Sequence, residues 1–294
     1  MSASFRDVFY QATDGLRLHA RMWEAESGNA LPVVCLPGLS RNVRDFHELA
    51  LFLSRQAGTA RTVIAFDYRG RGESARDPDW THYTVGVEAA DVLTGLDALQ
   101  IGRGAFIGTS RGGLIIHVLG ALRPQILGPI VLNDIGPKIE PEGLEHIRSY
   151  LGASDTPSSF EDAAIRLQAV HGPAFPALTE ADWNRFARAI YREVEGKLVP
   201  DFDPALLNGL AALDLTRPLP SLWEQFDLLA GRPLLTIRGA NSLLLSQATV
   251  DEMARRHPGM EVEIVRGQGH APLLETGGLP QRIAAFLDRA ESSA

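Results

Sequence analysis

A serine between glycines is the first feature that could do chemistry. Residues 108–113 read Gly-Thr-Ser-Arg-Gly-Gly, so Ser110 follows the apolar run 105–107 and precedes a helical pattern. A sharp strand-to-helix turn of this kind exposes the serine hydroxyl above a sheet, and the glycines let the chain pass close by. The backbone N–H of Arg111 would lie at a helix N-terminus and could stabilise an oxyanion. The pattern predicts a nucleophile at Ser110; an N-capping serine in a glycine-rich turn is the plainer interpretation.

A histidine near the end of the chain could supply the base that a serine needs. His270 lies in Gly-Gln-Gly-His-Ala-Pro, directly after the last apolar run. Imidazole has a pKa of about 6.5, so it can accept the serine proton at neutral pH. A loop after a strand of the same parallel sheet would reach the carboxyl edge where Ser110 is expected. We therefore expect His270 to be the general base.

An early turn could complete a site for a negatively charged oxygen. Residues 36–40 read Leu-Pro-Gly-Leu-Ser and follow a short apolar run. The backbone N–H of Leu39 is the expected second oxyanion donor, beside that of Arg111. A tight strand-to-helix turn without a catalytic role would use the same residues.

Taken together, these motifs resemble a known superfamily. The segments around Ser110, His270 and Leu39, with Phe-Asp-Tyr-Arg-Gly-Arg-Gly-Glu-Ser at 66–74, resemble the α/β-hydrolases in type and order. The resemblance covers nearly the whole chain, and residues 137–218 occupy the place of that family's variable cap. It implies a serine-type hydrolase that needs no cofactor and binds a small-molecule substrate between cap and sheet.

The acid of the expected triad is not where that family usually has it. The usual loop is 238–246 here, but no Asp or Glu lies between 239 and 250, and Leu243 stands where an aspartate would be expected. Asp134 is our expected acid, because it follows the strand 129–133 and some branches of the superfamily carry the acid there. A loop acid that caps the start of the insertion is the plainer interpretation of Asp134. A Ser–His dyad in a natural or engineered variant, or a loss of catalysis, are the other hypotheses.

The elements that position these residues follow a regular order. A hairpin with strands at 5–12 and 16–23 is expected to turn at Asp14-Gly15. Apolar strands then alternate with amphipathic helices, which is typical of a doubly wound, mostly parallel sheet covered on both faces. The fold class is therefore α/β.

The alternation breaks between residues 137 and 218. Helices are expected to follow one another there without strands, one of them starting from a capping box at Thr179 and Asp182. We therefore predict a hydrolase-fold core at 1–136 and 219–294, interrupted by a helical cap at 137–218.

Composition excludes several classes of function. The 294 residues have a formal net charge of −8 and no block of Lys or Arg, which argues against nucleic acid as a partner. The single cysteine, Cys35, excludes an internal disulfide and a cysteine-built zinc site, and no other metal-ligand spacing is present. No apolar run of about 18 residues or signal-peptide core occurs, so we expect a cytoplasmic protein with no membrane partner. Whether copies form a homo-oligomer is left open.

Three functions follow from these residues. The leading prediction is hydrolysis of a carboxylic ester of a small or medium-sized substrate through an acyl-enzyme on Ser110. Hydrolysis of a C–C bond next to a carbonyl would use the same residues. A small-molecule-binding protein without catalysis would explain the missing acid at Leu243.

Overall fold

One eight-stranded sheet organises the chain in the computed structural model, which describes residues 5–25, 27, 30–152, 156–217 and 219–292. The strand order is β1-β2-β4-β3-β5-β6-β9-β10. Only the pairs β1–β2 and β2–β4 are antiparallel; the others are parallel. The prediction of a doubly wound, mostly parallel sheet is confirmed. The strands are β1 (Arg6–Gln11), β2 (Arg17–Trp23), β3 (Val33–Leu36), β4 (Val63–Asp67), β5 (Gly104–Thr109), β6 (Leu127–Asn133), β9 (Leu234–Gly239) and β10 (Glu261–Val265).

The first hairpin turns where the sequence predicts it. β1 pairs with β2 from Arg6 opposite Met22 to Gln11 opposite Arg17. Gly15, between them, has φ of 85°, a conformation that glycine adopts without steric cost. The strands β3, β4 and β6 are buried along their whole length, as strands covered on both faces should be.

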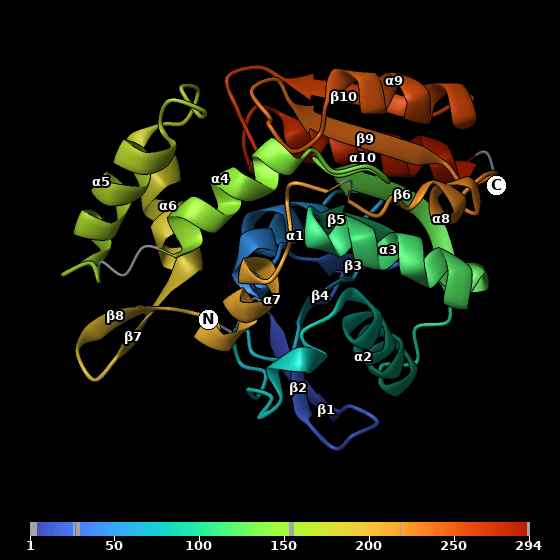
Figure 1. Ribbon diagram of the computed structural model, residues 1–294. Coiled ribbons are helices and arrows are strands. Elements are labelled where there is room, and N and C mark those ends of the chain that lie inside the picture. The colour runs from blue at the N-terminus through green and yellow to red at the C-terminus, as the bar shows by residue number, and fades with distance from the viewer. Residues whose placement is uncertain (1–4, 26, 28–29, 153–155, 218, 293–294) are drawn as a thin grey trace.

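Helices cover both faces of the sheet (Figure 1). Residues of α2, α3, α8 and α9 join one buried cluster, and those of α1 and α10 join another on the opposite face. Thr84 caps α2, as predicted, because its side chain accepts a hydrogen bond from the N–H of Val87. The bounds are α1 (His47–Ser54), α2 (Val85–Ala98), α3 (Arg111–Leu122), α8 (Trp223–Asp227), α9 (Gln247–Arg256) and α10 (Leu279–Ser292), with 3-10 helices η1 (Val43–Phe46), η2 (Trp80–His82) and η3 (Pro124–Ile126).

A long segment between β6 and β9 interrupts the sheet. Figure 1 shows α5 and α6 standing apart from the sheet, with α4 between them and the strand ends. The predicted capping box at Thr179 and Asp182 is present at the start of α6. The predicted boundary at Pro218 lies outside the described residues. The elements are α4 (Pro141–Leu151), α5 (Phe160–His171), α6 (Glu180–Ile190), β7 (Tyr191–Val194), β8 (Lys197–Pro200), η4 (Pro204–Leu206) and α7 (Leu207–Ala211).

The expectation that this segment has no strands is wrong. β7 and β8 pair antiparallel directly after α6. Glu195 and Gly196 connect them with φ of 51° and 73°. Two successive residues with positive φ form a tight turn whose twist matches the twist of the two flanking strands. The dipeptide Glu195-Gly196 was the only sign of a hairpin turn in this part of the sequence. The flanking residues do not alternate between apolar and polar, because only Leu198 of this hairpin is buried.

The inserted segment is tied to the sheet domain beside the early turn at 37–40. The Asn42 side chain donates a hydrogen bond of 2.9 Å to the carbonyl of Ala189, at the end of α6. Arg44 donates to the same carbonyl at 3.0 Å and forms an ion pair of 2.6 Å with Asp201, just after β8. Among the described residues, no helix is long and apolar enough to cross a membrane.

Candidate active site

Ser110 occupies a strained turn between β5 and α3. Its φ of 52° and ψ of −114° are rare for a residue with a side chain. The turn requires glycines nearby: a Cβ on Gly112 would lie 2.0 Å from the carbonyl oxygen of Leu36, and one on Gly108 would lie 2.6 Å from the Gly112 backbone. The Gly-x-Ser-x-Gly spacing therefore lets the start of α3 pack against β3 and β5 while Ser110 lines a cavity.

The structure brings Ser110, His270 and Asp134 together. Nε2 of His270 lies 2.9 Å from Oγ of Ser110, and Nδ1 lies 2.7 Å from Oδ2 of Asp134. The Asp134 side chain is fully buried, whereas that of His270 is 14% exposed. A buried carboxylate on Nδ1 keeps Nε2 free to accept a proton from the serine hydroxyl. This arrangement can activate Ser110 as a nucleophile.

Asp134 is fixed by the loop in which the acid is usually found. The Gly239 N–H donates to its Oδ1 at 2.8 Å, and the Ser242 hydroxyl donates to Oδ2 at 2.6 Å. Leu243, where an aspartate would be expected, is 45% exposed instead. The loop after β9 thus holds the carboxylate of Asp134, which follows β6, and carries no carboxylate of its own. Sequence reasoning missed Ser242, because its hydroxyl meets Asp134 only through the pairing of β6 with β9.

Hydrogen bonds on both sides of His270 hold the loop that carries it. The Asn133 side chain donates to the carbonyl of Pro272 at 3.0 Å, which ties this loop to the end of β6. Gln268, which is buried, accepts from the N–H of Leu273 at 2.9 Å and donates to the hydroxyl of Thr276 at 2.7 Å. These bonds limit how far the imidazole can move from Ser110.

The turn at 37–40 is oriented through its carbonyls. Tyr68 donates to the carbonyl of Pro37 at 3.2 Å, and Arg71 donates to that of Leu39 at 2.8 Å. With the carbonyls held from behind, the Leu39 N–H makes no hydrogen bond within the described part of the chain. The Arg111 side chain is bound elsewhere, to Glu88 and to the carbonyl of Tyr83. Its backbone N–H is in the first turn of α3, where no intrahelical acceptor exists.

A cavity of about 910 Å³ opens above Ser110 between the sheet domain and the inserted segment. Both parts of the chain contribute to its wall. Leu39 and His270 come from the sheet domain, and Tyr150, His171 and Phe186 come from the insertion. Burial, the neighbouring His146 and the Arg41 charge lower the pKa of His171 to about 4. This imidazole is therefore neutral at pH 7 and can act as a hydrogen-bonding group on the cavity wall. The volume suits a small or medium-sized ligand.

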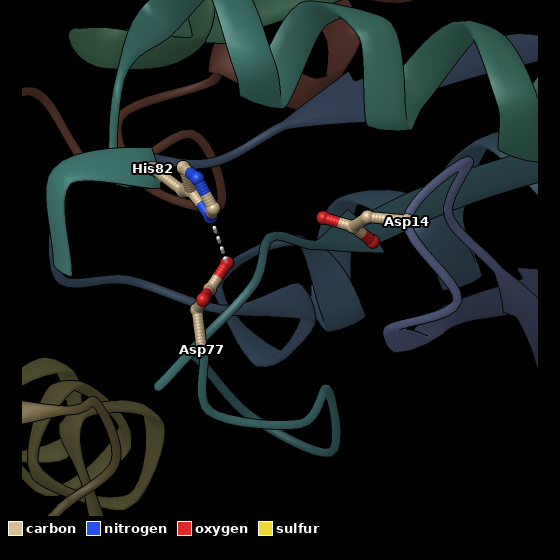
Figure 2. A group of neighbouring side chains, drawn as sticks. All are labelled: Asp14, Asp77 and His82. Atoms are coloured by element: carbon tan, nitrogen blue, oxygen red, sulfur yellow. Dashed lines mark hydrogen bonds and ion pairs between the residues drawn. The ribbon is translucent and has the colours of Figure 1, made fainter. Parts of the chain in front are cut away.

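A second cluster gathers side chains of the metal-binding type. Asp14, Asp77 and His82 place one ligand atom each within 4.8 Å of one another, and His82 bonds to Asp77 (Figure 2). The guanidinium of Arg69, however, contacts both Asp14 and Asp77 and pairs with Asp91. A cation is thus already present between the carboxylates, so the cluster serves to fix the turn after β4.

Comparison with known proteins shows the family to which this fold belongs. A family model described as the alpha/beta hydrolase fold matches residues 32–276. The 3-hydroxybutyrate-oligomer hydrolase of Cupriavidus necator is 32% identical over 92% of this chain and 94% of its own length. Esterase YbfF of Escherichia coli is 26% identical over 87% of this chain and 92% of its own. A crystal structure of an alpha/beta hydrolase from Novosphingobium aromaticivorans superposes with a TM-score of 0.90 at 36% identity, covering 98% of this chain and 100% of the other.

Proposed function

Because the chain belongs to the alpha/beta hydrolase family, we propose that it hydrolyses carboxylic esters of small to medium-sized substrates through an acyl-enzyme. One observation carries the proposal. The His270 imidazole contacts the Ser110 hydroxyl through one nitrogen and the Asp134 carboxylate through the other, beside a cavity that can hold the substrate. This is the arrangement that activates a serine at neutral pH.

The proposed reaction has two halves. Oγ of Ser110 attacks the ester carbonyl carbon while its proton moves to Nε2 of His270. The bond to the leaving oxygen then breaks, the alcohol takes that proton, and the acyl group stays on Ser110. In the second half a water molecule gives its proton to His270 and attacks the acyl carbon. The carboxylic acid leaves, and Ser110 recovers its proton.

Two further groups would lower the barrier. Asp134 would stabilise the positive charge that His270 carries after it takes the proton. The backbone N–H groups of Leu39 and Arg111 would donate to the oxygen that becomes negative in the tetrahedral intermediate. Their lack of another acceptor within the described residues supports this assignment.

A relative suggests the first natural type of substrate to try. The Cupriavidus necator protein is named for 3-hydroxybutyrate oligomers, whose units are joined by carboxylic esters. The linear 3-hydroxybutyrate dimer and trimer therefore belong in the first substrate set, beside 4-nitrophenyl esters of short acids.

The direct test is labelling with a fluorophosphonate, followed by intact mass and peptide mapping. A single rapid adduct on Ser110 is expected. Ser110→Ala should lower the rate of 4-nitrophenyl butyrate hydrolysis by roughly 10⁶-fold, to background. Ser221→Ala, a matched change at an exposed serine outside the cavity wall, should leave the rate unchanged.

Other outcomes would replace the proposal. A clear preference for a vinylogous diketo acid over 4-nitrophenyl esters would favour C–C bond hydrolysis. Tight small-molecule binding without turnover, unaffected by Ser110→Ala, would favour a binding protein. Undiminished ester hydrolysis by the Ser110→Ala variant would show that Ser110 is not the nucleophile.

A further inference from the structure

The charge on the cavity wall is opposite to that of the whole chain. The chain has a net charge of −8. Three acidic residues line the cavity, against twice as many arginines. The arginines are Arg21, Arg41, Arg44, Arg166, Arg185 and Arg188, and the acids are Asp45, Glu48 and Glu275. A wall with this excess of cations favours a negatively charged ligand.

Most of these arginines already have partners outside the cavity wall. Arg21 pairs with Asp7, Arg44 with Asp201 and Arg185 with Asp182. Arg41 differs, because both the residue and its partner line the cavity. Its charge is also among the causes that shift the pKa of His171 downward. Arg41 is therefore the cation that acts most directly on the interior of the cavity.

The first atoms of the Arg41 side chain lie close to those of Ser110. If Gly38 carried a Cβ, that atom would lie 3.3 Å from Cγ of Arg41 and 3.9 Å from Cβ of Ser110. The two side chains therefore start on the same short stretch of wall. A substrate whose ester carbonyl contacts Ser110 would have the atoms a few bonds away within reach of the Arg41 guanidinium.

The guanidinium is held along one edge. Its Nε donates to Asp45 Oδ2 at 2.8 Å and its Nη2 to Asp45 Oδ1 at 2.5 Å. The aromatic ring of Phe186 lies against its face, 4.5 Å from the central carbon. Nη1 makes no hydrogen bond to any described residue, and it is not among the fully buried unpaired atoms. An arginine fixed in this way presents its free edge to a second carboxylate with little loss of side-chain entropy.

We infer that Arg41 binds a carboxylate on the acyl part of the substrate while Ser110 attacks the ester carbonyl. The preferred substrates are then half-esters of short dicarboxylic acids, or other esters whose acyl part ends in a carboxylate. The linear 3-hydroxybutyrate dimer has its carboxylate on the alcohol part and would not make this contact. This inference rests on the proposed function, and it adds a substrate class and the residue that selects it.

Glu275 belongs to the same part of the wall. It makes no ion pair with any described residue, although the charges of Asp45, Arg185 and Arg41 all act on it. Burial raises the pKa of its carboxyl to about 7, and Asp45 adds to the rise. Near pH 7 this carboxyl is therefore about half protonated and opposes an anion only in part. Removing its charge should strengthen the binding of an anionic acyl group.

The test compares two esters that differ only at the end of the acyl chain. 4-Nitrophenyl hydrogen glutarate ends in a carboxylate, and 4-nitrophenyl pentanoate has a methyl group there. We expect kcat/KM to be higher for the glutarate in the wild-type protein. Arg41→Gln should lower kcat/KM for the glutarate about 10- to 100-fold, as expected for loss of a charged hydrogen bond, and change that for the pentanoate less than about threefold.

Two variants separate recognition from side effects. Arg41→Gln leaves the Asp45 carboxylate unpaired, and that charge could itself repel an anion. The double variant Arg41→Gln/Asp45→Asn removes both charges, and we expect the glutarate preference to stay lost. Glu275→Gln should raise the preference for glutarate by roughly threefold at pH 8, where the wild-type carboxyl is mostly ionised. Arg255→Gln makes the same charge change on an exposed part of α9 and should leave the preference unaltered.

The outcomes distinguish the two proposals. Turnover of pentanoate without any preference for glutarate would overturn the role of Arg41 and leave the ester hydrolase intact. An equal loss for both esters in the double variant would also overturn it, because the effect would not depend on the carboxylate. Turnover of neither ester, with no fluorophosphonate adduct on Ser110, would instead refute the proposed function itself.

Discussion

The sheet and the inserted segment form opposite sides of one cavity, and they are built differently. In the sheet, the residues proposed to react are held by the backbone of neighbouring strands. The Ser110 N–H donates to the carbonyl of Asn133 at 3.0 Å, and the Asp134 N–H donates to that of Ile237 at 2.7 Å. Both residues also adopt positive φ, which persists only where the surroundings enforce it.

The inserted segment has a smaller core of its own. α4 buries only Gly143 and Ile147, and α5 and α6 share a separate cluster around Trp183. The cluster consists of Ala163, Ala164, Leu167, Phe175, Trp183, Ala187 and Leu198. Several of the residues that face the cavity from this side, such as Phe186 and Ile190, are only partly buried.

The difference indicates a division of roles. Positions of the reacting atoms are set by strand pairing and by several hydrogen bonds each, so small changes there should cost rate. Positions on the inserted wall are set by a few side chains, so changes there should alter stability or substrate preference. Each experiment below tests one side of this division.

Of these experiments, Asp134→Asn should have the largest effect. The amide cannot stabilise the charged imidazole, so kcat should fall by about 10⁴-fold while the fold is retained. Steady-state kinetics with 4-nitrophenyl butyrate and a circular dichroism spectrum would check this. A loss of less than tenfold would mean that Ser110 and His270 work as a dyad and that Asp134 only shapes the loop.

Trp183→Ala should affect the inserted segment before the sheet. Removing a buried tryptophan from a cluster costs about 3–5 kcal/mol, and here the loss falls on a core of seven residues. Amide hydrogen exchange should increase in α5 and α6 and stay slow in β4 and β6. Equal acceleration in both regions would show that the two form one cooperative unit.

A histidine with a lowered pKa in each region predicts sensitivity to acid. Burial lowers the pKa of His117, in α3, and of His171, at the end of α5, to about 4 each. The unfolded chain then binds the proton more readily than the folded one, so stability is full above about pH 6.5 and declines as the pH falls towards 4. For His117 the decline should reach about 3 kcal/mol.

Urea unfolding at pH 8, 6 and 5 would measure this decline. His117→Gln removes the titrating group, so its stability should depend less on pH than that of the wild type, even if the substitution costs packing at every pH. Identical slopes for the two proteins would show that His117 does not bind a proton on unfolding in this range.

Of these experiments, Ser242→Ala should have the smallest effect. The substitution removes one donor from the Asp134 carboxylate, so kcat/KM should fall about tenfold, the effect of losing one hydrogen bond to a charged group. A circular dichroism spectrum like that of the wild type would show that the fold is retained. Ser246→Ala, which removes the cap of α9, should leave kcat/KM unchanged. An equal fall in kcat/KM for both variants would mean that Ser242 plays no part in positioning Asp134.

The parts of the site that lie within short motifs could be predicted from the sequence. Ser110 directly follows β5, His270 lies in the loop after β10, and glycines mark the tight turns around both residues. The doubly wound, mostly parallel sheet could be predicted from the alternation of apolar strands and helices alone. Asp134 was predicted from the resemblance, because it follows the strand after which some branches of that superfamily carry the acid and because Leu243 stands where the acid is usual.

Contacts between distant segments could not be predicted. Ser242 and Asp134 are 108 positions apart, and nothing near either residue signals the other. Arg41 looks like any surface arginine until the fold places Gly38 next to Ser110. The β7–β8 hairpin was missed because it is almost unburied, so its sequence lacks the alternation that marks a strand.

The attachment of Arg44 and Asn42 to the end of α6 bears on how such proteins diverge. Both side chains donate to the carbonyl of Ala189, which any residue at that position would provide. The ion pair with Asp201, in contrast, depends on an acidic side chain. Most residues of the insertion could therefore change during evolution, provided that the last turn of α6 and the acidic residue at position 201 are retained. A graft of another family member's insertion should succeed only if it brings that acid along.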